Sequence, residues 1–309
     1  MIITVTLNPA MDKTVTVPEF AVDKVNRVGS IRLDPGGKGI NVCKVVAALG
    51  GESIAMGLLG GNTGNAILKA LHQLTIESDF EIISGETRTN LKVVDPDEQT
   101  YTDINEPGPS LLPKEISAFE ERLFRRVKAG DIVVFAGGAP KEITPQMLSQ
   151  WALRCKKLGA FVYADLDGEL LAKTVETKPY FVKPNDAELE RLLGIKTETQ
   201  DDIVRGASLL LQKGIDRVVV SLGAKGALFA AEGQMLIAEN LPVEVRSTVG
   251  AGDSMLAAFA LCHTKGMSWS ESARWAMATA NAKVTCEGSS PPTLAQVEEN
   301  YRQIVCRSV

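Results

Sequence analysis

The feature that most constrains the fold of this sequence is a series of short, continuously apolar segments that alternate with segments of helical period. Residues 132–136 (IVVFA) and 218–222 (VVVSL) are apolar at nearly every position, so both faces of each strand must be covered. Strands of this kind are typical of a parallel sheet with helices on both faces. Their order predicts an α/β fold with a central, mainly parallel sheet. The predicted strands are residues 2–7, 53–59, 131–136, 160–165, 180–183 and 217–222, and the predicted helices are residues 39–49, 64–74, 144–157, 186–193, 201–213, 252–264, 270–284 and 294–305.

Two stretches interrupt this alternation and predict a small second sheet. Residues 13–17 and 28–33 form one pair of short alternating strands, and residues 88–94 and 100–104 form another. A small sheet that stands off a core is suited to act as a lid. We therefore expect one domain over residues 1–309, with a lid formed from about 12–34 and 87–105. An exposed face on such a sheet would need covering, which predicts a homodimer through the lids.

Composition excludes several classes of function. The net charge is −5, and no long run of Lys and Arg occurs, so we expect no nucleic-acid partner. The 5 cysteines are widely spaced without a CxxC pair, which predicts reduced thiols rather than disulfides or a zinc site. The first residues, MIITVTLNPA, lack the pattern of a signal peptide, and no apolar run is long enough to cross a bilayer. These features predict a cytoplasmic protein with no membrane partner.

The most informative motif is GAGD at residues 250–253, directly before the apolar helical run MLAAFALC. Small residues let the backbone approach a ligand, and the first N–H groups of a helix have no partner within the helix. Together with the helix dipole they form an anion site. Gly250, Ala251 and Gly252 are therefore candidates to stabilise the charge on a transferring phosphoryl group, and Asp253 is the candidate general base. By itself, such an Asp could also be a simple helix cap.

The full run TVGAGDS resembles the signature of the ribokinase-like, or PfkB-type, carbohydrate kinases. PGGKGINV, residues 35–42, is similar to the N-terminal signature of that family, and LNPAMDKTV, residues 7–15, to its first strand and turn. The resemblance extends from residue 2 to about residue 290. It implies a ribokinase-like three-layer fold, with ATP as phosphoryl donor and Mg²⁺ as metal. It also implies sugar contacts from Asp12, Gly36, Gly37, Lys38 and Asn41.

The same resemblance implies positions for the nucleotide and the metal. KPNDAE, residues 183–188, is similar to the KPNxxE segment of the family. It implies nucleotide contacts from Lys183 and Asn185, and Mg²⁺ held by Asn185 and Glu188 through water. Considered without the family, Asn185 and Glu188 could equally form a helix cap. Further nucleotide contacts are implied for Ser221, Gly223, Gly226 and Asn281.

A phosphorylated sugar would need fixed cations, for which arginine is well suited. Arg27 and Arg88 lie in the predicted lid segments, and Lys38 lies in the glycine-rich turn. TRTNLKV at residues 87–93, which contains Asn90, and INEPGP at residues 104–109 resemble 1-phosphofructokinases and tagatose-6-phosphate kinases. The resemblance implies conversion of fructose 1-phosphate and ATP to fructose 1,6-bisphosphate and ADP.

Three positions depart from that pattern. The loop AGGAP, residues 136–140, replaces SGSLP and removes two hydroxyls where the family approaches the sugar phosphate, so Gly138 is a contact candidate with no side chain. Asp167 brings a negative charge where a hydroxyl is usual, and residues 288–289 read Gly-Ser rather than Gly-Thr. These departures bear on the identity of the sugar and not on the GAGD motif.

Several alternatives remain open from the sequence. A kinase of the same fold could act on tagatose 6-phosphate, on fructose 6-phosphate, or on an unphosphorylated sugar or nucleoside. A non-catalytic sugar-phosphate sensor is a further possibility. A dinucleotide-binding oxidoreductase is disfavoured, because no GxGxxG follows the first strand.

Overall fold

A computed structural model describes residues 1–231 and 233–309 and contains a ten-stranded sheet as its central layer. The strand order is β14-β13-β12-β11-β10-β9-β8-β1-β4-β5, and every neighbouring pair from β11 to β5 is parallel. The antiparallel strands β12, β13 and β14 extend one edge. The bounds of the strands are β1 (Ile2–Thr6), β4 (Ser53–Gly60), β5 (Glu77–Ile83), β8 (Ile132–Ala136), β9 (Phe161–Asp165), β10 (Phe181–Val182), β11 (Arg217–Ser221), β12 (Ala227–Ala231), β13 (Gln234–Ala238) and β14 (Cys306–Ser308).

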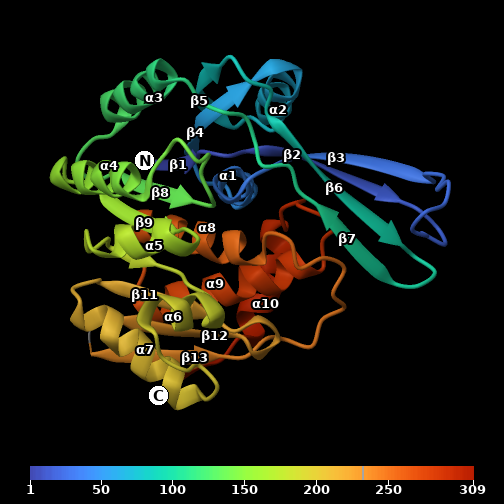
Figure 1. Ribbon diagram of the computed structural model, residues 1–309. Coiled ribbons are helices and arrows are strands. Elements are labelled where there is room, and N and C mark those ends of the chain that lie inside the picture. The colour runs from blue at the N-terminus through green and yellow to red at the C-terminus, as the bar shows by residue number, and fades with distance from the viewer. Residues whose placement is uncertain (232) are drawn as a thin grey trace.

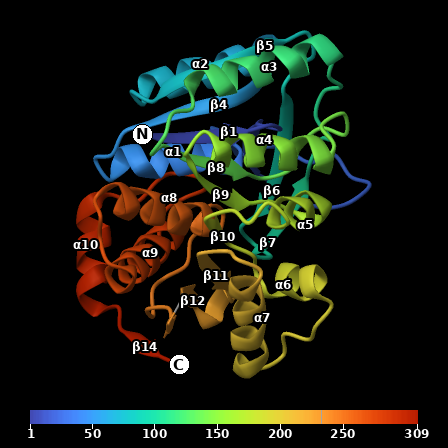
Figure 2. The same cartoon turned by 90° about the vertical axis from the view of Figure 1, so that its left-hand side faces the viewer.

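Helices cover both faces of this sheet and complete three layers, as the continuously apolar strands predict (Figures 1 and 2). In β8, Val133 and Phe135 pack into one apolar cluster, whereas Ile132 and Val134 pack into the other, because successive side chains of a strand point to opposite faces. Helices α3 (Pro113–Arg126), α4 (Pro145–Lys157), α5 (Gly168–Val175), α6 (Asp186–Leu193) and α7 (Gln200–Gln212) cover the first face. Helices α1 (Lys38–Ala48), α2 (Gly61–Gln73), α8 (Ala251–Thr264), α9 (Trp269–Val284) and α10 (Leu294–Gln303) cover the second.

A separate four-stranded sheet projects from the body at the right of Figure 1. We call it the lid sheet. It has the order β3-β2-β6-β7, with bounds β2 (Ala10–Thr16), β3 (Ser30–Gly36), β6 (Arg88–Asp95) and β7 (Thr100–Ile104). The central pair β2 and β6 is parallel, and the two outer pairs are antiparallel. The predicted second sheet is confirmed, and both excursions contribute to it.

The predicted strands and helices are all present, with ends that shift by up to three residues. The prediction ran helix 294–305 two residues too far, because the chain leaves the helix after Gln303 and enters β14. Strands β5, β12, β13 and β14 and helices α3 and α5 were missed. For α3 the signal was present, since Ile116, Phe119 and Leu123 follow helical spacing and are buried.

The cysteine side chains fit the expectation of reduced thiols. All five cysteines are free thiols, and Cys43, Cys155 and Cys262 are buried among apolar side chains. Across residues 1–231 and 233–309, no helix combines the length and the apolar character that crossing a bilayer requires.

Candidate active site

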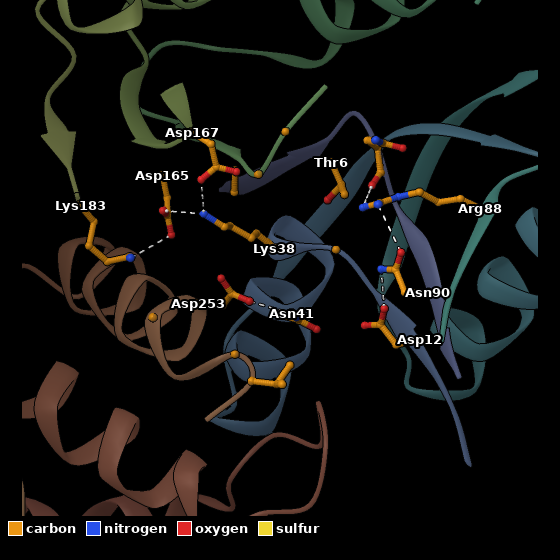
Figure 3. Close-up of a pocket in the computed structure, with 18 residues that line it drawn as sticks. Thr6, Asp12, Lys38, Asn41, Arg88, Asn90, Asp165, Asp167, Lys183 and Asp253 are labelled. Carbon is orange, nitrogen blue, oxygen red and sulfur yellow. Dashed lines mark hydrogen bonds and ion pairs between the residues drawn. The ribbon is translucent and has the colours of Figure 1, made fainter. Parts of the chain in front are cut away.

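A cavity of about 450 Å³ lies where the carboxyl ends of β1, β8 and β9 meet the lid sheet and the start of α8 (Figure 3). Ligands in parallel α/β folds bind at this end of the strands, because the loops that follow them converge there. The cavity is lined by Thr6, Asn8, Asp12, Gly37, Lys38, Asn41, Arg88, Asn90, Ala136, Gly137, Gly138, Asp165, Asp167, Lys183, Val249, Gly250, Gly252 and Asp253.

The GAGD motif forms the first turn of α8 at one wall of the cavity. Gly250 is the N-cap, in the left-handed conformation with φ 78°, and no side chain of the described residues caps this helix end. Glycine suits this conformation because it has no Cβ. A Cβ at Gly252 would lie 3.0 Å from Nζ of Lys183, so the bare backbone there leaves room beside an ammonium group. The helix end therefore presents N–H groups and a neighbouring cation to a ligand anion.

Asp253 lies in the same turn and is buried, with 6% of its surface exposed. Its Oδ2 accepts a hydrogen bond of 2.8 Å from Nδ2 of Asn41. Burial, and after it the negative charge of Asp165, raises the pKa of Asp253 to about 6, while Asn41 and nearby lysines limit the rise. A carboxylate with a pKa just below neutral is ionised at physiological pH and is basic enough to accept a hydroxyl proton.

This pKa predicts an acid limb in the activity profile. Activity should fall as the pH decreases through about 6, approaching tenfold per unit, because protonated Asp253 cannot accept a proton. The measurement is kcat/KM from pH 5 to 8 at constant ionic strength. A profile that stays flat to pH 5 would contradict the role given to Asp253.

Two lysines and two aspartates form an ion-pair network across the cavity (Figure 3). Nζ of Lys38 lies 3.3 Å from Oδ1 of Asp165 and 3.1 Å from Oδ1 of Asp167, and Nζ of Lys183 lies 3.1 Å from Oδ2 of Asp165. Burial opposes the charge on Lys38, but Asp165 and Asp167 raise its pKa well above the ordinary value. Asp167 does face the cavity, and Lys38 neutralises it. Displacing Asp167 would free Lys38 to meet a phosphate.

The opposite wall comes from the lid sheet. Oδ1 of Asp12 accepts a 2.9 Å hydrogen bond from Nδ2 of Asn90, and burial raises the pKa of Asp12. A Cβ at Gly36 would lie 2.1 Å from Oδ2 of Asp12, so only glycine permits this approach. Arg88 is fixed by bonds to the carbonyl oxygens of Asn8 and Glu106. The wall thus offers a carboxylate for hydroxyls and a guanidinium for an anion.

Some lining atoms have no partner within the described residues. Oγ1 of Thr6, which is 2% exposed, and Oδ1 of Asn41, which is 7% exposed, make no hydrogen bond there, and neither do Oδ1 of Asn8 and Nε of Arg88. Buried polar atoms normally have hydrogen-bond partners, so these atoms indicate that the cavity binds a polar ligand.

The sequence predictions missed Thr6, Asn8 and Asp165. Thr6 and Asp165 end β1 and β9, and a rule that takes the last polar residue of each parallel strand would have found both.

The remaining predicted contacts lie outside the cavity lining. Arg27 is exposed in the loop between β2 and β3. Ser221 ends β11 and bridges to Asn185, while Gly223 and Gly226 have positive φ of 56° and 94° in the turn that follows. Asn281 is buried, and its amide bonds Leu241, Asn240 and Met277. Asn185 and Glu188 form a reciprocal cap at the start of α6.

The comparisons with known proteins agree with this geometry. The family model of the pfkB family carbohydrate kinases matches residues 5–296. The chain belongs to this family. The 1-phosphofructokinase of Vibrio cholerae is 35% identical over 303 residues, which are 98% of this chain and 95% of that protein.

Two solved structures of phosphofructokinase-2 from Escherichia coli have the same fold as this kinase. The complex with substrates and products is 30% identical, with a TM-score of 0.94 and coverage of 98% of both chains. The complex with fructose-6-phosphate is 29% identical, with a TM-score of 0.92 and the same coverage. The ribokinase-like three-layer fold and the assignment as a carbohydrate kinase are therefore confirmed.

Proposed function

We propose that this kinase transfers the γ-phosphoryl group of ATP to a hydroxyl of a sugar phosphate, with fructose 1-phosphate as the substrate and fructose 1,6-bisphosphate as the product. The observation that carries the proposal is the composition of the cavity. It combines a buried general base at a helix N-terminus with Arg88 and Lys38, two fixed cations on separate walls. The curated relatives named 1-phosphofructokinase support the choice of sugar.

In this mechanism the sugar lies against Asp12, Asn41 and Asn90, which bond its hydroxyls, and its phosphate meets Arg88. The attacking hydroxyl lies beside Asp253 and gives its proton to the carboxylate as its oxygen bonds the γ-phosphorus. The bond from the γ-phosphorus to the β,γ-bridging oxygen breaks, and ADP leaves. The N–H groups at Gly250–Gly252 stabilise the charge of the moving phosphoryl group. Lys183 adds positive charge beside Gly252.

The nucleotide lies over the turn 221–226, where Gly223 and Gly226 keep the backbone open. At Gly226 a Cβ would lie 2.0 Å from the carbonyl oxygen of Ala238, so no other residue fits without a shift. Asn281 supports this site indirectly, since it holds the backbone of Leu241 through a 2.8 Å bond. We therefore assign Asn281 a supporting role, in which it holds the backbone next to the proposed adenine site and does not contact the nucleotide itself.

The residues near α6 fit a magnesium ion. One carboxylate oxygen of Glu188 caps Asn185, and the other has no protein donor in the described parts of the chain. Burial raises the pKa of Glu188, and Asp165 and Asp167 also favour a cation there. Mg²⁺ binds few protein ligands and keeps several waters, so one carboxylate with Asn185 nearby suffices. Bound with ATP, the ion would neutralise phosphate charge.

Replacing Glu188 with glutamine should raise the Mg²⁺ concentration needed for half-maximal activity several-fold. Glutamine keeps the helix cap but lacks the charge that attracts the hydrated ion. The measurement is initial rate against free Mg²⁺ at saturating ATP and sugar phosphate. Glu190→Gln, on the exposed side of the same helix, is the matched control. An unchanged Mg²⁺ requirement in Glu188→Gln would remove Glu188 from the metal site.

The lid sheet supports a homodimer. Its face toward the cavity carries Asp12 and Asn90, whereas its outer face exposes Ile31, Leu33 and Ile104 at 59%, 58% and 54%. Exposed apolar side chains on one face of a sheet are typical of an interface, and the outer faces of two copies would cover each other in a symmetric dimer. Arg27 lies in the loop that joins β2 and β3.

A dimer through the lid is expected to dissociate when Leu33 is replaced with glutamate, because the charge would be buried at the interface. Analytical ultracentrifugation at micromolar protein should give a dimer for the wild type and a monomer for the variant. Val305→Glu changes a 68% exposed residue outside the lid and should remain a dimer. A monomeric wild type would contradict the proposal.

A coupled ADP-release assay tests the function. The panel is fructose 1-phosphate, fructose 6-phosphate, tagatose 6-phosphate, fructose and ribose, each with ATP and Mg²⁺. We expect kcat/KM of at least ~10⁴ M⁻¹s⁻¹ for fructose 1-phosphate, well above the other sugars. A preference for fructose 6-phosphate would favour the second candidate, which the likeness to phosphofructokinase-2 supports. No turnover in a folded, ATP-binding protein would favour a sugar-phosphate sensor.

A further inference from the structure

Two lysines outside the cavity lining are buried behind the anion site. Lys44 on α1 is 4% exposed, and its Nζ donates to Oγ of Ser289 at 2.7 Å and to the carbonyl oxygen of Pro35 at 3.2 Å. Lys283 in the last turn of α9 is 1% exposed, and its Nζ donates to the carbonyl oxygen of Gly288 at 2.7 Å. Both ammonium groups thus bind the loop that follows α9, and neither contacts the ligand space directly.

Neither ammonium group forms an ion pair within 4.0 Å in the part of the chain that the structure describes, and each bonds only neutral oxygens. Burying a charge without a paired counterion is costly, and two like charges close together add to that cost. Burial lowers the pKa of Lys44 to about 8, and it also lowers the pKa of Lys283. The carboxylates of Asp34, Asp12 and Asp253 act on Lys44 from beyond ion-pair distance and offset part of this cost.

The position of Lys283 beside the GAGD turn suggests a use for its buried positive charge. Cε of Lys283 lies 3.5 Å from the point where a Cβ at Gly250 would stand, so its stem packs against the N-cap of α8. The carboxylate of Asp253, 3.8 Å from the same point, and the amide of Asn41, 3.9 Å from it, surround that residue. The side chain of Lys283 therefore lies behind the backbone that faces the transferring phosphoryl group, and Lys44 is close enough for its charge to act on both Lys283 and Asp253.

We propose that Lys283 and Lys44 are positioning residues that form a built-in cation pair behind the anion site, where they hold the Gly250 turn and stabilise the negative charge that accumulates during phosphoryl transfer. The inference rests on the proposed kinase reaction. Fixed charges in a water-excluded site act strongly on developing charge because they need no reorganisation. The neighbouring carboxylates offset the resting cost of the pair only in part, and the negative charge that develops on the transferring phosphoryl group completes the neutralisation.

The first test replaces Lys283 with methionine, which keeps the apolar stem and removes the charge. We expect kcat to fall at least ~10-fold with the KM for ATP nearly unchanged, because the charge acts on the transition state. In titration calorimetry, binding of ADP with aluminium fluoride, a mimic of the transferring phosphoryl group, should weaken by a similar factor. Binding of ADP alone should not change. Lys265→Met, an exposed residue at the opposite end of α8, is the matched control.

The second test uses the alkaline limb of kcat/KM. Lys44 faces Asp12 and Asp34 from the lid strands, Asp253 from α8 and Lys283 from α9, and Arg32 and Cys286 lie near Lys283. As the pH rises through about 8, Lys44 loses its proton and the wild-type rate should fall. Lys44→Met should start lower and lack this limb, so the two profiles converge above pH 9.

The outcomes separate this inference from the proposed function. Unchanged kcat, unchanged aluminium fluoride binding and an unchanged alkaline limb in folded variants would overturn the cation pair while leaving the kinase assignment intact. If the wild type phosphorylates no sugar in the panel, calorimetry still tests the pair, because it requires no sugar turnover. If Lys283→Met shows no cooperative thermal transition, the profile of Lys44→Met decides. Recovery of Lys283→Ala activity by ammonium or methylammonium, but not by sodium, would support the charge itself.

Discussion

Asp253→Asn is expected to lower kcat by at least ~10²-fold with little change in the KM for either substrate. The amide keeps the shape of the side chain, and its oxygen can still accept the 2.8 Å hydrogen bond from Asn41. It cannot accept a proton from the attacking hydroxyl, so only the contribution of the general base is lost. Steady-state kinetics at pH 7.5 with saturating Mg²⁺ measure the effect. The acid limb near pH 6 should be absent from the residual activity.

The stability of the same variant is the control for an intact fold. The folded-state pKa of Asp253, about 6, lies above its unfolded value near 3.8, so ionising the buried carboxyl costs stability on the order of 3 kcal/mol. That cost is absent below about pH 4 and complete above about pH 6. Asn carries no charge, so the variant should have the higher Tm at pH 7.5 and no such advantage near pH 4.

Two further observations complete the test of Asp253. Asp216→Asn removes an exposed carboxylate far from the cavity and should leave both kcat and Tm unchanged. Turnover of Asp253→Asn within a few-fold of the wild type would contradict the role of general base. A variant that is inactive and also less stable would indicate a structural role for the carboxylate instead.

Arg88→Met should raise the KM for the sugar phosphate by about 10–100-fold and leave the KM for ATP within a few-fold. Hydrogen bonds to charged groups contribute about 1.5–3 kcal/mol each, and removal of the guanidinium would lose at least one to the phosphate. The bonds to the carbonyl oxygens of Asn8 and Glu106 hold the group at the cavity before a substrate arrives. Its Nε, buried and without a partner in the described residues, is available to a ligand.

The test of Arg88 also measures the phosphorylation of a neutral sugar. If Arg88 binds the substrate phosphate, its replacement should weaken activity toward the sugar phosphate and leave activity toward the neutral sugar unchanged. Slow phosphorylation of an unphosphorylated sugar should proceed at the same rate in wild type and variant. Arg302→Met, on the exposed surface of α10, controls for the loss of a positive charge. Equal losses for the phosphorylated and neutral sugars would mean that Arg88 supports the lid sheet rather than the substrate phosphate.

The sequence alone determined the class of fold and the position of the GAGD turn at the start of α8, because both depend on local patterns. Continuously apolar strands such as IVVFA can lie only in a sheet covered on both faces. GAGD directly before an apolar helix can occupy only the N-terminus of that helix. The small second sheet was also predictable, since its strands alternate where the rest of the chain does not.

Only the tertiary structure decided which side chains share one space. Lys38 lies more than a hundred residues before Asp165 and Lys183 in the sequence, and the parallel strand order brings all three into one network. The tertiary structure also placed Thr6 in the cavity lining and Arg27 outside it. The side-chain amide of Asn281 forms its hydrogen bonds with other parts of the protein. The local propensities of the residues do not predict such long-range contacts, because the contacts depend on the order of the strands and on the packing of helices that are far apart in the sequence. Lys44 and Lys283 have the same origin, since these two lysines became buried cations only when α1 and α9 packed behind the start of α8.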